Sequence, residues 1–281
     1  MLLLSTGSLY TKPIAQVFTW AQEAGFDGVE LLVDRRPETR DRRHIQSCMK
    51  QTALPVPVVH VPFHSQPTAE WGTDSVDRVL ATAALAQELG ARLVVVHLPL
   101  WRERRFARWL LEELPTAENR LELVLAVENL PAKRWLRLVP HFRRWPFLFR
   151  EQSSQGPLGR LLTAISHPDR RLNTAEELAR FGHVVFDTTH WARRGDVSKF
   201  WARLKGRVAH IHIANYAAGR GHRLPWDGEI DMCNFLNKVQ EDGYGGHLTA
   251  ELCPRALGDP DEEVVRNRLS EVAAWLRSAW A

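Results

Sequence analysis

Cysteine is scarce in this 281-residue chain, and the three cysteines form no metal-binding pair. Cys48, Cys233 and Cys253 lie far apart, without the Cys-x-x-Cys spacing that thiolate zinc sites use. Long apolar runs are also missing, since none reaches the ~18 residues that a membrane-spanning helix requires. The sequence therefore argues against a disulfide framework, a thiolate zinc module and a membrane-spanning protein.

Nucleotide-binding and export signals are absent as well. The first predicted strand-to-helix link, residues 5–9, contains no Gly-x-Gly-x-x-Gly fingerprint, and no Walker A motif occurs. Residues 1–5 are too short for the apolar core of a signal peptide and have no basic lead-in. We expect a cytoplasmic protein that does not use a dinucleotide fold.

The overall composition is that of a globular protein with a slight excess of positive charge. Hydrophobic residues make up 44% and charged residues 25% of the chain, and the formal net charge is +4. Arginine-rich codon usage would explain this charge as well as an anionic partner would. Charge alone therefore makes nucleic acid a less favoured partner than a small molecule, and the oligomeric state stays open.

Eight short apolar runs alternate with stretches that have helical spacing. Glycines such as Gly25 and Gly90 follow the predicted helices 13–24 and 75–89, as expected at helix ends. Runs buried on both faces and separated by helices indicate parallel strands. We predict an α/β protein, a single (β/α)8 TIM barrel over residues 1–281, with strands at residues 2–5, 28–32, 56–61, 93–97, 121–128, 183–186, 208–213 and 247–252.

One connection is much longer than the others. It is a predicted loop insertion at about residues 132–173, and residues 134–150 within it are rich in arginine and tryptophan. Long loops in compact domains often cover or bind ligands. A lid, an interface between subunits, a nucleic-acid surface and a plain solvated helix all remain open for this segment.

Potential metal ligands stand at the ends of the last four predicted strands. Strand ends of a barrel converge on one rim, so residues far apart in sequence meet there. A Glu/Asp/His/Glu set suits Mn2+, Mg2+, Co2+ or Zn2+. The predicted ligands are Glu128, Asp187, His212 and Glu251.

Two further histidines end the third and fourth predicted strands. His60 and His97 should point into the same mouth as Glu128. They would form a second metal site with that carboxylate, or bind substrate if a single ion is present.

Several short motifs resemble those of the xylose isomerase-like barrels, which include sugar epimerases and, more distantly, endonuclease IV. The resemblance covers nearly the whole chain and rests on residues 25–31, 127–129, 187–190, 210–212 and 222–231. It implies that Glu128, Asp187, His212 and Glu251 hold the metal. It also implies that His190 touches substrate and that His212, rather than His210, is the ligand. In the last motif Trp226 replaces a family glycine.

Endonuclease IV binds three zinc ions, and the resemblance matches eight of its nine ligand positions. The ninth position, an aspartate in that family, is Arg220 here, and a guanidinium cannot coordinate a cation. A complete third metal site is therefore not expected. The eight matched positions are His60, His97, Glu128, Asp187, His190, His212, His222 and Glu251.

The resemblance leaves two catalytic functions open. We favour a sugar isomerase or epimerase in which Glu128 and Glu251 move a proton next to a carbonyl while they anchor the metal. The substrate, a small carbohydrate or derivative, would then contact His190, Arg220, His222 and Trp226. The alternative is a zinc-dependent phosphodiesterase that acts on abasic DNA, and a binding barrel without catalysis is a third hypothesis.

Overall fold

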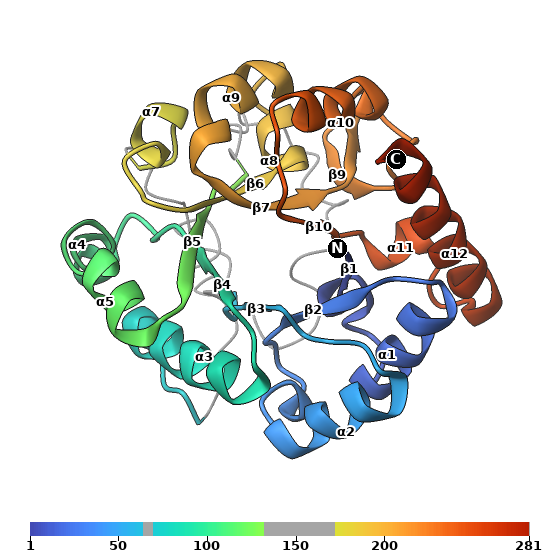
Figure 1. Cartoon of the computed structure of the whole chain (residues 1–281), viewed down its shortest axis with the longest axis horizontal. Coiled ribbons are helices and arrows are strands. Elements are labelled where there is room, and N and C mark those ends of the chain that lie inside the picture. The colour runs from blue at the N-terminus through green and yellow to red at the C-terminus, as the bar shows by residue number, and fades with distance from the viewer. Residues whose placement is uncertain (64–69, 132–171, 281) are drawn as a thin grey trace, which may run out of the picture.

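The computed structural model describes residues 1–63, 70–131 and 172–280. Eight parallel strands close into a barrel with the order β1-β10-β7-β6-β5-β4-β3-β2, and helices surround it (Figure 1). The predicted (β/α)8 TIM barrel is confirmed. The strands are β1 (Leu2–Ser5), β2 (Gly28–Leu32), β3 (Val58–His60), β4 (Leu93–His97), β5 (Val124–Glu128), β6 (Val184–Asp187), β7 (Val208–Ile213) and β10 (His247–Ala250).

The helices follow the strands in the expected alternation. Among the described residues they are α1 (Ile14–Glu23), α2 (Arg42–Thr52), α3 (Ser75–Leu89), α4 (Arg104–Glu112), α5 (Leu114–Leu121), α7 (Ala175–Leu178), α8 (Thr188–Ala192), α9 (Val197–Leu204), α10 (Met232–Glu241), α11 (Pro254–Leu257) and α12 (Glu262–Ala279). No helix in these ranges has the length and apolarity needed to cross a membrane.

Helix α3 shows how the sequence sets these boundaries. Asp74 accepts hydrogen bonds from the backbone N–H groups of Val76 and Asp77, which begins the helix. Gly90 ends it in the left-handed region, with φ of 75°. The predicted span of 75–89 is therefore confirmed at both ends.

Some predicted strands begin too early in the sequence. The run from residue 121 was predicted as a strand, yet β5 starts at Val124. Leu121 ends α5, and Glu122 then turns the chain with φ of 53°. Apolar content alone does not separate a buried helix end from a strand start, which explains the error.

The barrel interior is filled below its polar rim. Inward-facing side chains from β1, β3, β4, β5 and β6 pack together there, and they are Leu3, Val58, Leu93, Val95, Ala126 and Val185. A second, larger apolar layer lies between the barrel and the helices. The inside of the barrel is thus a packed core, and polar chemistry is confined to one end.

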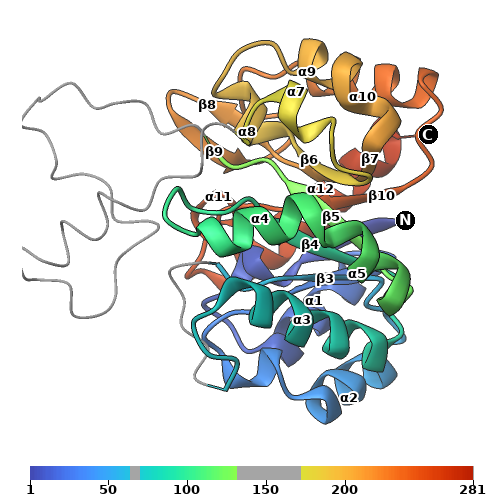
Figure 2. The same cartoon turned by 90° about the vertical axis from the view of Figure 1, so that its left-hand side faces the viewer.

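That end carries an additional hairpin. Strands β8 (Asn215–Ala217) and β9 (Arg220–Arg223) pair antiparallel after β7. Figure 2 shows the hairpin at the opposite end of the barrel from the two chain termini. The hairpin therefore brings residues 220–223 to the rim where the strands end.

The predicted single domain over residues 1–281, with its insertion at about 132–173, stays a prediction. Residues 132–171 lie outside the described part of the chain. The arginine- and tryptophan-rich segment belongs to this range, so its predicted roles are not placed by the structure.

Candidate metal centre

The four predicted metal ligands meet at the rim of the barrel. Glu128 and Asp187 are the last residues of β5 and β6, His212 lies near the end of β7, and Glu251 follows β10. Each offers an atom within 4.8 Å of the atoms that the others offer. All four side chains belong to buried or nearly buried residues, with exposed fractions from 1% to 9%. We call these four residues the quartet.

The imidazole of His212 lies at the centre of the quartet. Its Nδ1 atom is 3.0 Å from Oε1 of Glu128 and 3.0 Å from Oε2 of Glu251. The same nitrogen is 3.9 Å from Oδ2 of Asp187. Three carboxylates therefore surround one ring nitrogen.

The quartet fits a divalent cation. Oδ2 of Asp187 and Oε2 of Glu251 are buried, and neither has a hydrogen-bond partner within the described residues. A buried carboxylate oxygen without such a partner is unfavourable, and a cation would compensate it. Three oxygen donors and one nitrogen suit Mn2+, Mg2+, Co2+ or Zn2+, so the donor set does not select one of them.

A second cluster shares Glu128 with the quartet. The Nε2 atoms of His60 and His97, at the ends of β3 and β4, each lie 3.4 Å from Oε2 of Glu128. Nδ1 of His60 lies 2.9 Å from the carbonyl oxygen of Val61. A carbonyl only accepts, so Nδ1 of His60 carries a proton and donates it to this bond. With Nδ1 held in this way, Nε2 is the ring nitrogen that faces Glu128, and it is the atom that would bind a second metal ion.

The third group of donors shares Asp187 with the quartet. Asp187, His190 and His222 offer atoms within 4.8 Å of one another. His190 donates through Nδ1 to the carbonyl oxygen of Asn129 (2.6 Å), and His222 donates through Nδ1 to that of Glu251 (3.0 Å). Both rings are therefore held at the rim by backbone acceptors.

The two remaining predicted substrate residues lie further out. Arg220 begins β9 and is exposed, two positions before His222 in the hairpin. Trp226 is 41% exposed, and its ring centroid lies 6.0 Å from that of Trp275 on α12. The structure thus places Trp226 against an outer helix, and none of the donor groups includes it.

Electrostatics keep Glu128 and Glu251 ionised. Burial alone would raise the pKa of Glu128, but the hydrogen bond and charge of His212 and the hydrogen bond of His60 hold it well below its usual range. Burial also raises the pKa of Glu251, but the positive charges of His212 and His222 outweigh this effect and lower the pKa to about 2. For His212 burial lowers the pKa, and the charges of Glu30 and Glu251 outweigh this and raise it well above its usual value.

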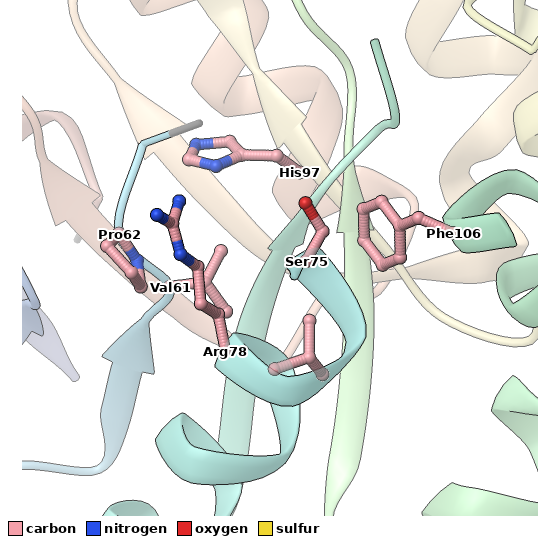
Figure 3. A pocket seen from close by; sticks show the side chains of 7 residues that line it. Val61, Pro62, Ser75, Arg78, His97 and Phe106 are labelled. Atoms are coloured by element: carbon pink, nitrogen blue, oxygen red, sulfur yellow. The ribbon is translucent and has the colours of Figure 1, made fainter. Parts of the chain in front are cut away.

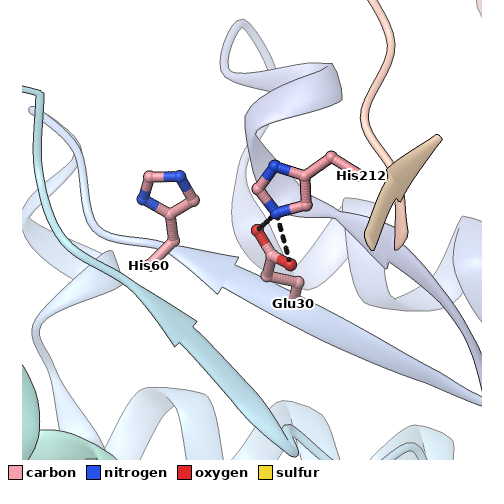
Figure 4. Close-up of side chains that lie close together, drawn as sticks. All are labelled: Glu30, His60 and His212. Atoms are coloured by element: carbon pink, nitrogen blue, oxygen red, sulfur yellow. Dashed lines mark hydrogen bonds and ion pairs between the residues drawn. The ribbon is translucent and has the colours of Figure 1, made fainter. Parts of the chain in front are cut away.

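Glu30 is a further buried carboxylate that was not among the predicted ligands. It is fully buried in β2, and its Oε2 lies 2.7 Å from Nε2 of His210 and 3.2 Å from Nε2 of His212. Figure 4 shows its carboxylate beside the His212 ring, with His60 nearby. The signal was present in the sequence, because Gly28-Val29-Glu30 is another apolar run that ends in a carboxylate.

Aromatic and basic groups surround the second cluster. The ring of Phe63 stacks on His97 with a centroid distance of 5.0 Å. A small cavity beside His97 is lined by Val61, Pro62, Ser75, Arg78, Val79 and Phe106 (Figure 3). Burial lowers the pKa of Arg78. Phe63 and Arg78 were not predicted from the sequence, since neither lies at a strand end.

An α/β barrel with polar side chains gathered at the carboxyl ends of its strands has the architecture that TIM-barrel enzymes share. The family model of the xylose isomerase-like TIM barrel matches residues 18–279, and the chain belongs to this family. The resemblance found in the motifs is therefore confirmed. The family includes sugar isomerases and epimerases, which supports an enzymatic role.

Comparison with individual proteins agrees with this assignment. The uncharacterized protein Rv0498 of Mycobacterium tuberculosis is 26% identical over 265 residues, which cover 92% of this chain and 91% of that protein. The 3-keto-D-glucoside 4-epimerase YcjR of E. coli has a TM-score of 0.66 and 17% identity, with 99% and 98% of the two chains covered. An AP endonuclease of family 2 from Brucella melitensis has a TM-score of 0.67 and 18% identity, with the same coverage. At these identities the two structures establish the shared fold.

Proposed function

We propose that the protein is a metal-dependent isomerase or epimerase of a sugar or sugar derivative. The observation that carries this proposal is the approach of Glu128 and Glu251 to the same point from two different strands, each 3.0 Å from Nδ1 of His212. Two ionised carboxylates on either side of a substrate carbon are what proton removal and return require.

The quartet would hold the ion through Glu128, Asp187, His212 and Glu251. A divalent ion bound there supplies Lewis-acid polarisation of the substrate oxygens next to the reacting carbon. The orientation of Asp187 is fixed from the chain itself, since its Oδ1 accepts from Oγ1 of Thr189 and from the backbone N–H of His190, both at 2.8 Å. This leaves Oδ2 directed to the shared point.

Proton transfer would be the work of the two glutamates. One carboxylate takes a proton from the carbon beside the carbonyl, and the other returns one, which inverts the centre or moves the carbonyl. Their low pKa values keep both groups ionised at neutral pH, which is the form that a proton acceptor needs.

Substrate orientation would come from His190 and His222, the two histidines of the third donor group. The rings of His190 and His222 meet edge to face with centroids 5.6 Å apart, and their backbone-bound Nδ1 atoms leave Nε2 for substrate hydroxyls. Arg220 would bind a carboxylate or phosphate of the substrate. Trp226, which lies beside Trp275, would stack on the sugar ring of the substrate.

A second candidate function is favoured by the cluster of His60, His97 and Glu128. Two neighbouring ions that share a carboxylate would activate water and neutralise a phosphate, as in a zinc-dependent phosphodiesterase on abasic DNA. Arg220, which stands where that family has a metal ligand, weighs against a complete three-ion centre. We therefore place this function second.

One experiment separates the two functions. Protein loaded with Mn2+ or Zn2+ is incubated in heavy water with ketohexoses, ketopentoses and hydroxy-keto acids, and products are analysed by mass spectrometry. The proposal requires incorporation of solvent deuterium at the carbon next to the carbonyl of at least one substrate. Cleavage of an abasic-site oligonucleotide without any such exchange would establish the phosphodiesterase instead.

A further inference from the structure

Glu30 lies directly behind the metal-facing histidine of the quartet. Its Oε2 accepts a hydrogen bond from Nε2 of His210 at 2.7 Å. Both carboxylate oxygens lie 3.2 Å from Nε2 of His212. Glu30 and His210 are fully buried and His212 is 1% exposed, so the contacts are shielded from water.

The two nitrogens of His212 face different groups. Nδ1 faces the carboxylates of Glu128 and Glu251, whereas Nε2 faces Glu30. An ionised carboxylate can only accept a hydrogen bond, so without an ion both nitrogens, which lie beside carboxylates, would carry protons. When an ion takes the place of the proton on Nδ1, the nitrogen next to Glu30 keeps its own. A neutral imidazole with its proton on Nε2 has its lone pair on Nδ1. That lone pair points into the quartet.

Glu30 forms this contact without a conventional counter-ion. Within the described residues, Glu30 forms ion pairs with His210 and His212 only. A carboxylate that is buried without a lysine or arginine partner destabilises the folded state, unless hydrogen bonds compensate the loss of hydration. The two imidazole N–H groups are those hydrogen bonds. The simplest structural role of Glu30 would be to link β2 to His210 and His212 of β7 through these hydrogen bonds.

A direct ligand role for Glu30 is the competing explanation. Glu30, His60 and His212 offer atoms within 4.8 Å of one another, so a cation could be drawn between them (Figure 4). Such an ion would have to displace the Nε2 proton of His212 and the hydrogen bond to Glu30. The short contact of the same carboxylate with His210 is better explained by two N–H donors.

We infer that Glu30 is a positioning residue for the metal centre: it holds the Nε2–H of His212 and thereby directs the Nδ1 lone pair at the quartet. The inference rests on the proposed binding of a divalent ion by the quartet. Partners of this kind fix the ring orientation of a metal-bound histidine and raise its basicity. Glu30 itself touches neither the ion nor the substrate.

The wild-type protein provides the first test. Protein labelled with 15N-histidine is loaded with Zn2+, and the protonated nitrogen of each ring is identified from 15N–1H correlation spectra. The expected result is a His212 ring with a slowly exchanging proton on Nε2 and a zinc-shifted Nδ1. A proton on Nδ1, or a ring without any proton because a second ion occupies Nε2, would overturn the inference.

The Glu30→Gln variant provides the second test, with Asp34→Asn as its matched control. A glutamine amide is uncharged and has an NH2 donor in place of one carboxylate oxygen, so it holds the two histidine N–H groups more weakly than the carboxylate does. We expect the affinity for Zn2+, measured by competition with a chromophoric chelator, to fall by about 10–100-fold. Asp34 is also a buried carboxylate, follows the same strand and pairs with Arg36 at 2.6 Å. Its substitution disturbs a buried ion pair without touching His212, so zinc affinity should be retained.

The outcomes are separable. Wild-type affinity in Glu30→Gln, or an equal loss in Asp34→Asn, would show that Glu30 is merely structural. If the wild-type protein bound no divalent ion, the proposed function would fail and this inference with it. If Glu30→Gln did not fold, the ring protonation in the wild-type spectra would decide.

Discussion

Nδ1 of His212 lies 3.0 Å from Oε2 of Glu251, so the end of β7 is joined to the residue that follows β10. The contact links neighbouring strands of the closed barrel. Because barrel closure holds these two strand ends together, the donors are in place before any ion arrives. A pre-arranged donor set loses less conformational entropy on binding than a flexible one does.

Substituting either proposed acid/base glutamate should harm turnover more than metal binding. Glu128→Gln and Glu251→Gln each keep an oxygen donor, but an amide cannot accept a proton at neutral pH. We expect deuterium exchange into substrate to fall by about 10²–10⁴-fold, with a smaller loss of metal affinity. Glu88→Gln, at a half-exposed surface ion pair with Arg42, is the control. Equal losses of turnover and metal would identify the glutamates as ligands only.

Binding of an ion to the quartet should stabilise the fold. An ion that binds the folded protein but not the unfolded chain raises the free energy of unfolding. The increase is about 2.7 kcal/mol when the free ion concentration is 100 times the dissociation constant. For a chain of this size we expect the melting temperature to rise by roughly 5–10 °C. The comparison is thermal melting in Mn2+ and in EDTA, for the wild type and for Asp187→Asn. Identical melting of the wild type under both conditions would contradict the metal centre.

The double variant His60→Ala/His97→Ala tests the second cluster. Neither histidine belongs to the quartet, so one ion per chain should remain bound after the substitution. Activity should decrease, because the two rings contact Oε2 of Glu128 and line the same mouth. Metal content by elemental analysis and turnover are measured on the same sample. Full activity would demote both histidines to structural residues.

Acid should destabilise the protein partly through His247. Burial, and then the charge of His210, lower the pKa of His247 to about 4. The unfolded chain therefore binds this proton more readily, and stability is complete above the ordinary value of 6.5 and is lost as the pH falls towards 4. Urea unfolding at pH 7 and pH 5 should show a smaller decrease in His247→Gln than in the wild type. Equal decreases in both proteins would mean that His247 does not contribute.

The sequence predicted the quartet because its logic is purely topological. A carboxylate or imidazole at the end of a buried apolar run must reach the rim of a barrel, whichever helices follow. The contact between Glu30 and the ring of His212 could not be predicted in this way. Strand periodicity says that Glu30 points inward, but the register between strands decides which ring nitrogen it meets. The same limit applies to Phe63, which reaches His97 from a loop.

The start of β5 shows a different limit. The apolar residues before Val124 belong to the end of α5 and to the turn at Glu122. The pattern of hydrophobic residues does not predict the positive φ of Glu122. Strand ends, which carry the polar residues, were predicted more closely than strand starts. The long insertion remains a prediction, because residues 132–171 lie outside the described ranges.

The carboxylate of Glu128 divides its two oxygens between neighbours, Oε1 towards His212 and Oε2 towards His60 and His97. One ion in the quartet and a second ion beside His60 and His97 would therefore both draw electron density from the carboxylate of Glu128. Occupancy of one position then alters affinity at the other, and thermodynamic linkage requires the same factor in both directions. A titration with metal would show two unequal, mutually dependent steps in place of independent ones.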